Sequence, residues 1–136
     1  MNVLVDTNVV LDILLAREPW LSDSQAVWRA CDEGRIIGYL LASTLTDIFY
    51  IARRIVGRDK ALEAVEICLA TFEICPIDRT VLEGALKLAG KDFEDDVQIS
   101  AAMQAELAAI VTRNPDDFAH ATIPVLLPAQ LISQLS

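Results

Sequence analysis

The chain has 136 residues, of which 54% are hydrophobic and 23% charged, and its formal net charge is −9. This size and composition suit a folded protein with a buried core and exclude an intrinsically disordered one. No apolar stretch reaches the roughly 20 residues of a membrane-spanning helix. Asp6 and Asp12 interrupt the first apolar segment, where a secretion signal would be uninterrupted. We therefore expect a cytoplasmic protein with no membrane partner.

Cysteine and histidine chemistry has little support in the sequence. Cys31, Cys68 and Cys75 are far apart and none lies in a Cys-x-x-Cys pair. This pattern is typical of reduced thiols rather than of a disulfide framework or a zinc site. His120 is the single histidine, and no nucleophile-elbow motif accompanies it, so we set hydrolysis by Ser-His-Asp or Cys-His groups aside.

Apolar runs typical of strands alternate with the spaced apolar positions typical of helices. Candidate N-caps precede several of the helical patterns: Thr7 or Asn8, then Ser43 or Thr44, and later Asp78. In chain order we predict strand 2–5, helix 9–16, helix 19–34, strand 36–42, helix 43–57, helix 59–70, strand 72–77, helix 78–90, helix 95–109, strand 110–112, strand 123–127 and a closing helix from Pro128.

The alternation predicts the fold class. Strands that are continuously apolar, with helices between them, are typical of a mostly parallel sheet covered on both faces. Pro76 favours an edge position for strand 72–77, because proline cannot donate to a neighbouring strand. Residues 1–136 contain no linker or repeat, so we expect one three-layer α/β/α domain with about five strands.

Acidic and amide side chains gather where such a sheet would bind its ligand. Ligands of parallel sheets bind beyond the carboxyl ends of the strands. Asp6 directly follows the first strand, and Asp47 lies about one turn into the helix after the second. Two more groups flank the fourth strand: Asp92, Glu94, Asp95 and Asp96 before it, and Thr112, Asn114, Asp116 and Asp117 after it.

This arrangement favours metal-assisted cleavage of a phosphodiester. Mg²⁺ and Mn²⁺ prefer carboxylate and water oxygens. One or two such ions can activate a water molecule and stabilise a leaving oxygen without help from histidine or cysteine.

Each acid also has a structural explanation. Asp6 could cap a helix or occupy a turn. Asp47 could face solvent, although aspartate is a poor helix former. The helix macrodipole favours acids such as those at 92–96, and Asp116 and Asp117 suit an ordinary turn. All of these explanations would have to hold together to remove the predicted site.

Four segments of the chain resemble PIN-domain ribonucleases, and in particular the VapC-type toxins of toxin–antitoxin pairs. The segments are VLVDTNVVLDIL, STLTDIFYIARR, DFEDDVQISAA and VTRNPDDF. They occur in the order of the family and cover almost the whole chain. The resemblance implies a PIN-like fold.

The resemblance also implies roles for individual residues. Asp6 matches the family's first acid, and Asp95 matches the acid that opens the late helix. Asp47 stands where the family commonly has glutamate. Many relatives have aspartate where this chain has Asn114, so Asp117 could take over as the fourth metal ligand. The resemblance implies catalysis by Asp6, Asp47 and Asp95, which would hold the metal with Asp117.

Other polar residues match supporting positions. Asn8 and Thr112 resemble groups that hold the first acid, Asn114 could act with them, and Asp92 could assist Asp95. The resemblance implies Mg²⁺- or Mn²⁺-dependent endonucleolytic cleavage of RNA. It further implies a homodimer and, for the toxins, inhibition by an antitoxin protein.

An acidic protein that cuts RNA needs a basic surface. Arg53, Arg54, Arg58 and Lys60 form the densest basic group and could bind phosphate. Compensation of the helix dipole is an equally good explanation of these charges.

Two other functions compete with the nuclease. The shorter acid at Asp47 and the amide at Asn114 leave open a PIN-like module that binds RNA or protein without cutting. A phosphoacceptor receiver domain is less favoured, because Thr7 follows Asp6 where a second acid is needed and no lysine follows Leu127.

Overall fold

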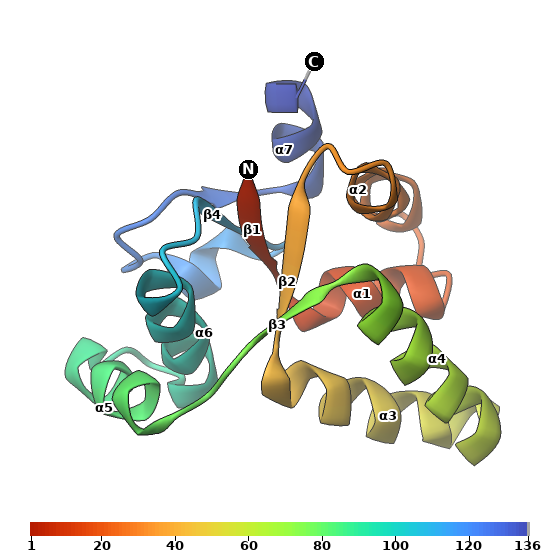
Figure 1. Ribbon diagram of the computed structural model, residues 1–136, viewed down its shortest axis with the longest axis horizontal. Coiled ribbons are helices and arrows are strands. Elements are labelled where there is room, and N and C mark those ends of the chain that lie inside the picture. Colours follow the sequence, from red (N-terminus) through yellow and green to blue (C-terminus); the bar gives the residue numbers. More distant parts are fainter. Residues whose placement is uncertain (136) are drawn as a thin grey trace.

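The computed structural model describes residues 1–135, which form a central sheet with helices on both faces (Figure 1). All four strand pairs are parallel, and the order across the sheet is β3-β2-β1-β4-β5. This confirms the predicted α/β/α class and the edge position of β3. The strands are β1 (Asn2–Val5), β2 (Ile37–Leu41), β3 (Glu73–Cys75), β4 (Ala109–Val111) and β5 (Val125–Leu126).

Helices connect the strands and cover the sheet. Gly57 has φ of +87°, which favours glycine, and it ends one helix, as predicted. It also precedes the next helix directly, so that helix begins at Arg58 rather than at the predicted residue 59. No helix within residues 1–135 is long and apolar enough to cross a bilayer. The helices are α1 (Thr7–Leu14), α2 (Leu21–Asp32), α3 (Ala42–Val56), α4 (Arg58–Thr71), α5 (Arg79–Leu88), α6 (Phe93–Gln104), α7 (Pro128–Leu135) and the short 3-10 helix η1 (Pro115–Phe118).

The two faces of the sheet are buried by different helices. Val3 and Val5 of β1 point to a core shared with α1, α2, α3, α4 and α7. Leu4 points the other way, into a core shared with α5, α6 and η1. This alternation follows from the two-residue period of a strand. Figure 1 shows α5 and α6 on one side of the sheet and α1 to α4 on the other.

The predicted N-caps of the first and third helices are wrong. Asp6 and Leu41 are the extended residues that precede α1 and α3, and neither helix has a side-chain cap. Each strand runs straight into its helix, so Thr7 and Thr44 already lie within helices. Their hydroxyls bond to each other at 2.9 Å. Asn8 and Ser43 also lie inside these helices, whereas the predicted cap at Asp78 is confirmed by its 2.9 Å bond from the Val81 N–H.

Several predicted boundaries are also wrong. The late helix begins at Phe93 rather than residue 95, because the Asp92 side chain caps it. It ends at Gln104 rather than residue 109, since the Ala108 N–H already bonds to the Asn2 carbonyl of β1. The first strand has its predicted bounds and the fourth is shifted by one residue, whereas the predicted strands 36–42, 72–77 and 123–127 are too long because apolar runs continue into the connections.

Candidate active site

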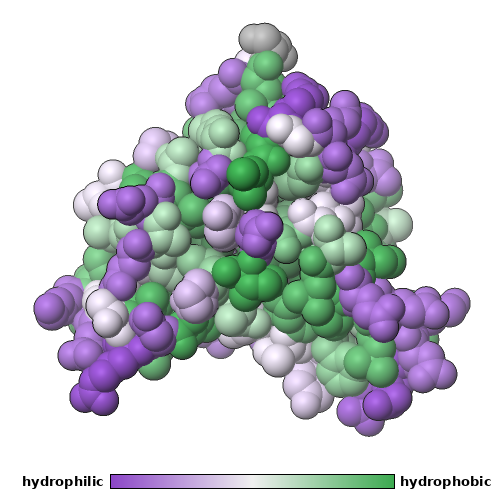
Figure 2. All heavy atoms as spheres, in the orientation of Figure 1, coloured by the Kyte–Doolittle hydropathy of each residue, from purple (hydrophilic) through white to green (hydrophobic). Residues whose placement is uncertain are grey.

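A cleft of about 530 Å³ opens where β1 and β2 end and α1, α3 and α6 begin. Figure 2 shows the molecule hollowed between the side formed by α5 and α6 and the side formed by α3 and α4. No lysine, arginine or histidine of the described chain lines this cleft. Its polar lining comprises Asp6, Thr7, Asn8, Ser43, Thr44, Asp47, Glu94, Asp95, Gln98 and Asp117.

Asp6 is the most deeply held of these acids, with 6% of its surface exposed. One carboxylate oxygen accepts a 2.9 Å bond from the Thr112 hydroxyl, and the other accepts a 3.3 Å bond from the Gln98 amide. Burial raises the pKa of Asp6, although both hydrogen bonds oppose the rise. The side chain is therefore fixed in orientation by neutral donors, with no cation beside it in the cleft lining.

The pKa of Asp95 is raised by burial and by acidic neighbours. Burial, followed by the charges of Asp92, Asp117 and Asp6, raises the pKa of Asp95 to about 6. Burial also raises the pKa of Asp47, which lies on α3 and is more exposed than Asp6. The structure thus brings Asp6, Asp47, Asp95 and Asp117 to one cleft, each from a different segment of the chain.

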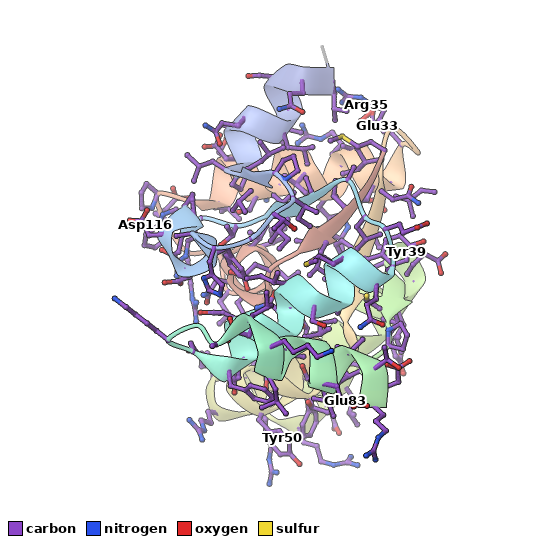
Figure 3. The ribbon with its side chains drawn as sticks, turned by 90° about the vertical axis from the view of Figure 1, so that its left-hand side faces the viewer. Glu33, Arg35, Tyr39, Tyr50, Glu83 and Asp116 are labelled. Atoms are coloured by element: carbon purple, nitrogen blue, oxygen red, sulfur yellow. The ribbon has the colours of Figure 1, made fainter. Side chains whose placement is uncertain are left out.

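The remaining predicted acids have structural partners or lie outside the cleft. Asp92 caps α6 by accepting a 2.9 Å bond from the Glu94 N–H. Asp96 is buried and accepts a 2.8 Å bond from the Gly90 N–H, with His120 Nε2 at 2.7 Å. Asp116 is exposed, and Figure 3 shows it at the outer edge of η1.

The predicted supporting residues divide in the same way. Asn8 lines the cleft, and Thr112 is fully buried against Asp6. Asn114 is exposed and does not line the cleft; its N–H donates a 3.0 Å bond to the Thr112 hydroxyl. Of Asn114 and Asp117, the two candidates for a fourth metal ligand, Asp117 is the one that lines the cleft.

Sequence reasoning missed Gln98 as a partner of Asp6. It is 8% exposed, and its amide oxygen has no hydrogen-bond partner within residues 1–135. Its position three residues after Asp95 on a helix could have revealed it, because residues three apart share a helix face. Glu94, which also lines the cleft, was treated only as part of the acidic run.

The predicted basic group lies apart from the cleft lining. Arg53, Arg54, Arg58 and Lys60 are all exposed where α3 meets α4. Arg58 lies 3.8 Å from Asp59. Figure 2 shows hydrophilic side chains gathered at this corner of the molecule.

The donor chemistry of the cleft fits a hard divalent cation. Carboxylates are the preferred protein ligands of Mg²⁺ and Mn²⁺. Within residues 1–135, however, no three Asp, Glu, His or Cys side chains are already arranged to hold an ion. Mg²⁺ usually keeps several waters and needs only one or two protein carboxylates, so the donor set suits the ion even though the side chains do not form a closed cage.

Several solved structures resemble this chain. FitAcB from Neisseria gonorrhoeae has 20% sequence identity and a TM-score of 0.73, with 93% of this chain and 98% of that chain covered. VapBC-1 from nontypeable Haemophilus influenzae has 13% identity and a TM-score of 0.74, with 95% and 99% covered. Mycobacterium tuberculosis VapC20, described as a sarcin-ricin loop cleaving toxin, has 13% identity and a TM-score of 0.69, with 86% and 93% covered.

These TM-scores show a shared fold. A search among curated proteins finds no match. The family model of the PIN domain matches residues 2–116, which include β1 through β4 and every acid of the cleft except Asp117. On that match, together with the parallel five-stranded sheet, the chain belongs to the PIN domain family.

Proposed function

We propose that this protein is a metal-dependent endoribonuclease and the toxin of a toxin–antitoxin pair. The observation that carries the proposal is the charge of the cleft. Asp6, Asp47, Glu94, Asp95 and Asp117 line it, and no basic side chain among the described residues does. Carboxylates held together without a cation repel one another, and a bound divalent cation removes that repulsion.

Asp6, Asp47, Asp95 and Asp117 would hold one or two Mg²⁺ or Mn²⁺ ions. When bound, such an ion lowers the pKa of a water molecule and stabilises charge on the phosphate that is attacked. The chain supplies orientation: the Thr112 hydroxyl and the Gln98 amide hold both oxygens of Asp6. Asn8, on the first turn of α1, lines the same cleft and would bond to the substrate or to groups held by Asp6.

RNA is the proposed substrate because the chain resembles PIN toxins and one solved structure of the same fold is described as a sarcin-ricin loop cleaving toxin. Arg53, Arg54, Arg58 and Lys60 would contact RNA phosphates outside the cleft. Two further partners are proposed. An antitoxin protein is one, since a solved structure of the same fold is described as a toxin–antitoxin complex from Klebsiella pneumoniae; a second copy of this chain is the other, and the resemblance to PIN toxins implies it. Toxicity that is relieved by the product of a neighbouring gene would test the first, and the mass of the protein in solution would test the second.

Cleavage of total RNA in Mn²⁺, Mg²⁺ or EDTA tests the proposal. The protein is compared with Asp6→Asn and with Asp116→Asn, which removes an exposed acid outside the cleft. We expect metal-dependent fragments from the parent and from Asp116→Asn. Asp6→Asn should lose about 1000-fold in rate, because several kcal/mol of transition-state stabilisation depend on the metal.

Two outcomes would contradict the proposal. Equal cleavage by the parent and by Asp6→Asn would assign the activity to a contaminating ribonuclease. No cleavage with either metal, from folded protein free of inhibitor, would favour a PIN-like module that binds RNA or protein without cutting.

A further inference from the structure

A buried ion pair lies behind the cleft and is not explained by the proposed chemistry. Asp12 of α1 is completely buried, and neither of its oxygens has a hydrogen-bond partner within residues 1–135. Arg113 Nε lies 3.4 Å from one oxygen, and an Arg17 guanidinium nitrogen lies 3.8 Å from the other. The Arg113 guanidinium also stacks 3.7 Å from the centre of the Trp20 ring.

Charge balance alone does not explain this cluster. One arginine suffices to neutralise one carboxylate, yet Asp12 has two. Arg17 comes from the connection directly after α1, close to Asp12 in the sequence, whereas Arg113 comes from the connection after β4, far away in the sequence. Burial raises the pKa of Asp12, and Arg113 opposes that rise more than Arg17 does. Buried ion pairs are weak evidence for stability, so a role in fixing one arrangement of the chain is the better explanation.

The connection that carries Arg113 also builds the cleft. The preceding residue, Thr112, donates its hydroxyl to Asp6 at 2.9 Å. The Asn114 N–H then bonds back to the Thr112 hydroxyl at 3.0 Å, and η1 carries Asp117 into the cleft. Segment 112–117 is therefore joined to α1 and its N-cap at two points, Thr112 to Asp6 and Arg113 to Asp12.

We propose that Asp12 and Arg113, with the Arg113 guanidinium held on Trp20, are positioning residues that fix segment 112–117 against α1. The pair keeps the Thr112 hydroxyl on Asp6 and keeps Asp117 in the cleft. Its effect on cleavage rests on the proposed nuclease function, whereas its effect on the segment does not.

The test compares Arg113→Gln with Arg17→Gln. Each variant removes one arginine from Asp12, but only the first releases segment 112–117. Amide hydrogen exchange at Asn114 reports on the segment directly, because that N–H bonds to the Thr112 hydroxyl. We expect exchange at Asn114 to accelerate several-fold in Arg113→Gln and to stay at the parent rate in Arg17→Gln.

Cleavage kinetics provide the second measurement. Arg113→Gln should lower kcat by about 10- to 100-fold, the usual effect of removing a group that orients a metal ligand. Arg17→Gln should keep the parent kcat at a similar melting temperature. Arg113→Lys should recover part of the loss, because it restores the charge but not the planar stack on Trp20.

Equal exchange at Asn114 in the two glutamine variants would overturn the proposal, as would a kcat that falls only in proportion to lost folded protein. A parent that fails to cleave RNA would contradict the proposed function, and the exchange comparison would still decide whether Arg113 fixes the segment.

Discussion

Asp95 and Asp96 are consecutive residues of one helix, and their surroundings are opposite. Asp95 faces a cleft lined by other acids, and burial, followed by the charges of nearby acids, raises its pKa to about 6. Asp96 faces away, where the Gly90 N–H and His120 bond to its carboxylate. Asp6 and Asp12 repeat the contrast around α1: the first is held by neutral donors at the cleft, and the second lies between two arginines.

The contrast separates acids that have a compensating partner from acids of the cleft that have none among the described residues. Burial does not distinguish them, since Asp6, Asp12 and Asp96 are all buried. The difference is in the compensating group, because the chain supplies a cation or potential cation to Asp12 and Asp96 and supplies none to the cleft. Sites whose charge the protein leaves uncompensated are candidates for binding a cation from solution.

The largest expected effect on stability comes from breaking the Asp96 contacts. Asp96→Ala leaves the Gly90 N–H and His120 without their acceptor, and hydrogen bonds to a charged group contribute about 1.5–3 kcal/mol. We expect the free energy of unfolding, measured by urea denaturation, to fall by about 3 kcal/mol. Asp95→Ala, the matched control, should not destabilise the protein. An equal loss in the two variants would remove the distinction between the two acids.

A smaller effect is expected from Asp117, which lines the cleft, compared with Asp116, which does not. Asp117→Asn should slow RNA cleavage about tenfold, equivalent to about 1.4 kcal/mol in the barrier. Asp116→Asn carries the same change of charge and should cleave at the parent rate. Measured kcat values that fall together would assign the effect to net charge rather than to a metal ligand.

The raised pKa of Asp95 predicts a pH-dependent stability in the absence of metal. The pKa of Asp95 is about 6 in the folded protein against an ordinary value of 3.8, so the folded state binds the proton more tightly. Stability from this group is complete below the lower pKa and is lost as the pH rises through the upper one. Asp95→Asn should therefore be more stable than the parent at about pH 8, by on the order of 1 kcal/mol after solvent screening, and the difference should vanish near pH 3.

Urea denaturation in EDTA across this pH range measures that difference. Saturating Mn²⁺ should reverse it at about pH 8, because the ion stabilises the parent and not the variant. A parent whose stability relative to Asp95→Asn rises with pH in EDTA would contradict the assigned environment.

The smallest expected effect concerns RNA binding by the basic group formed by Arg53, Arg54, Arg58 and Lys60. Arg54→Glu should weaken RNA binding a few-fold at low salt and reduce its salt dependence, because phosphate contacts release counterions. Arg79→Glu is the control, since Arg79 is exposed on α5 and paired with Glu83 at 3.2 Å. Binding can be measured in the Asp6→Asn background to prevent cleavage. Equal weakening of RNA binding by both changes would show that the basic group is an ordinary solvated surface.

Much of this fold could be predicted from local pattern. The strands are continuous apolar runs because both faces of the sheet are covered, and Pro76 marked the edge strand next to it. Four of the five acids of the cleft could be predicted because strand ends in a parallel sheet meet at one edge. The predicted first residues of the helices after β1 and β2 are wrong, because strand and helix adjoin without the loop that a capping threonine needs.

Long-range pairing could not be predicted in the same way. Asp96 belongs to an acidic run that the helix dipole already explains, and nothing local pairs it with His120. Asp12 interrupts an apolar stripe, but its arginine partner at position 113 depends on how the connection after β4 packs on α1. Such contacts require the three-dimensional fold, and they decide which acids of the described chain remain without a cation beside them.

Calorimetric titration of Mn²⁺ into the parent, Asp6→Asn and Asp116→Asn tests the central claim most directly, because it requires no knowledge of the RNA. The uncompensated cleft predicts binding to the parent and to Asp116→Asn, and strongly weakened binding to Asp6→Asn. Equal binding by all three proteins, or no binding by the folded parent, would show that the acids of the cleft do not form a metal site.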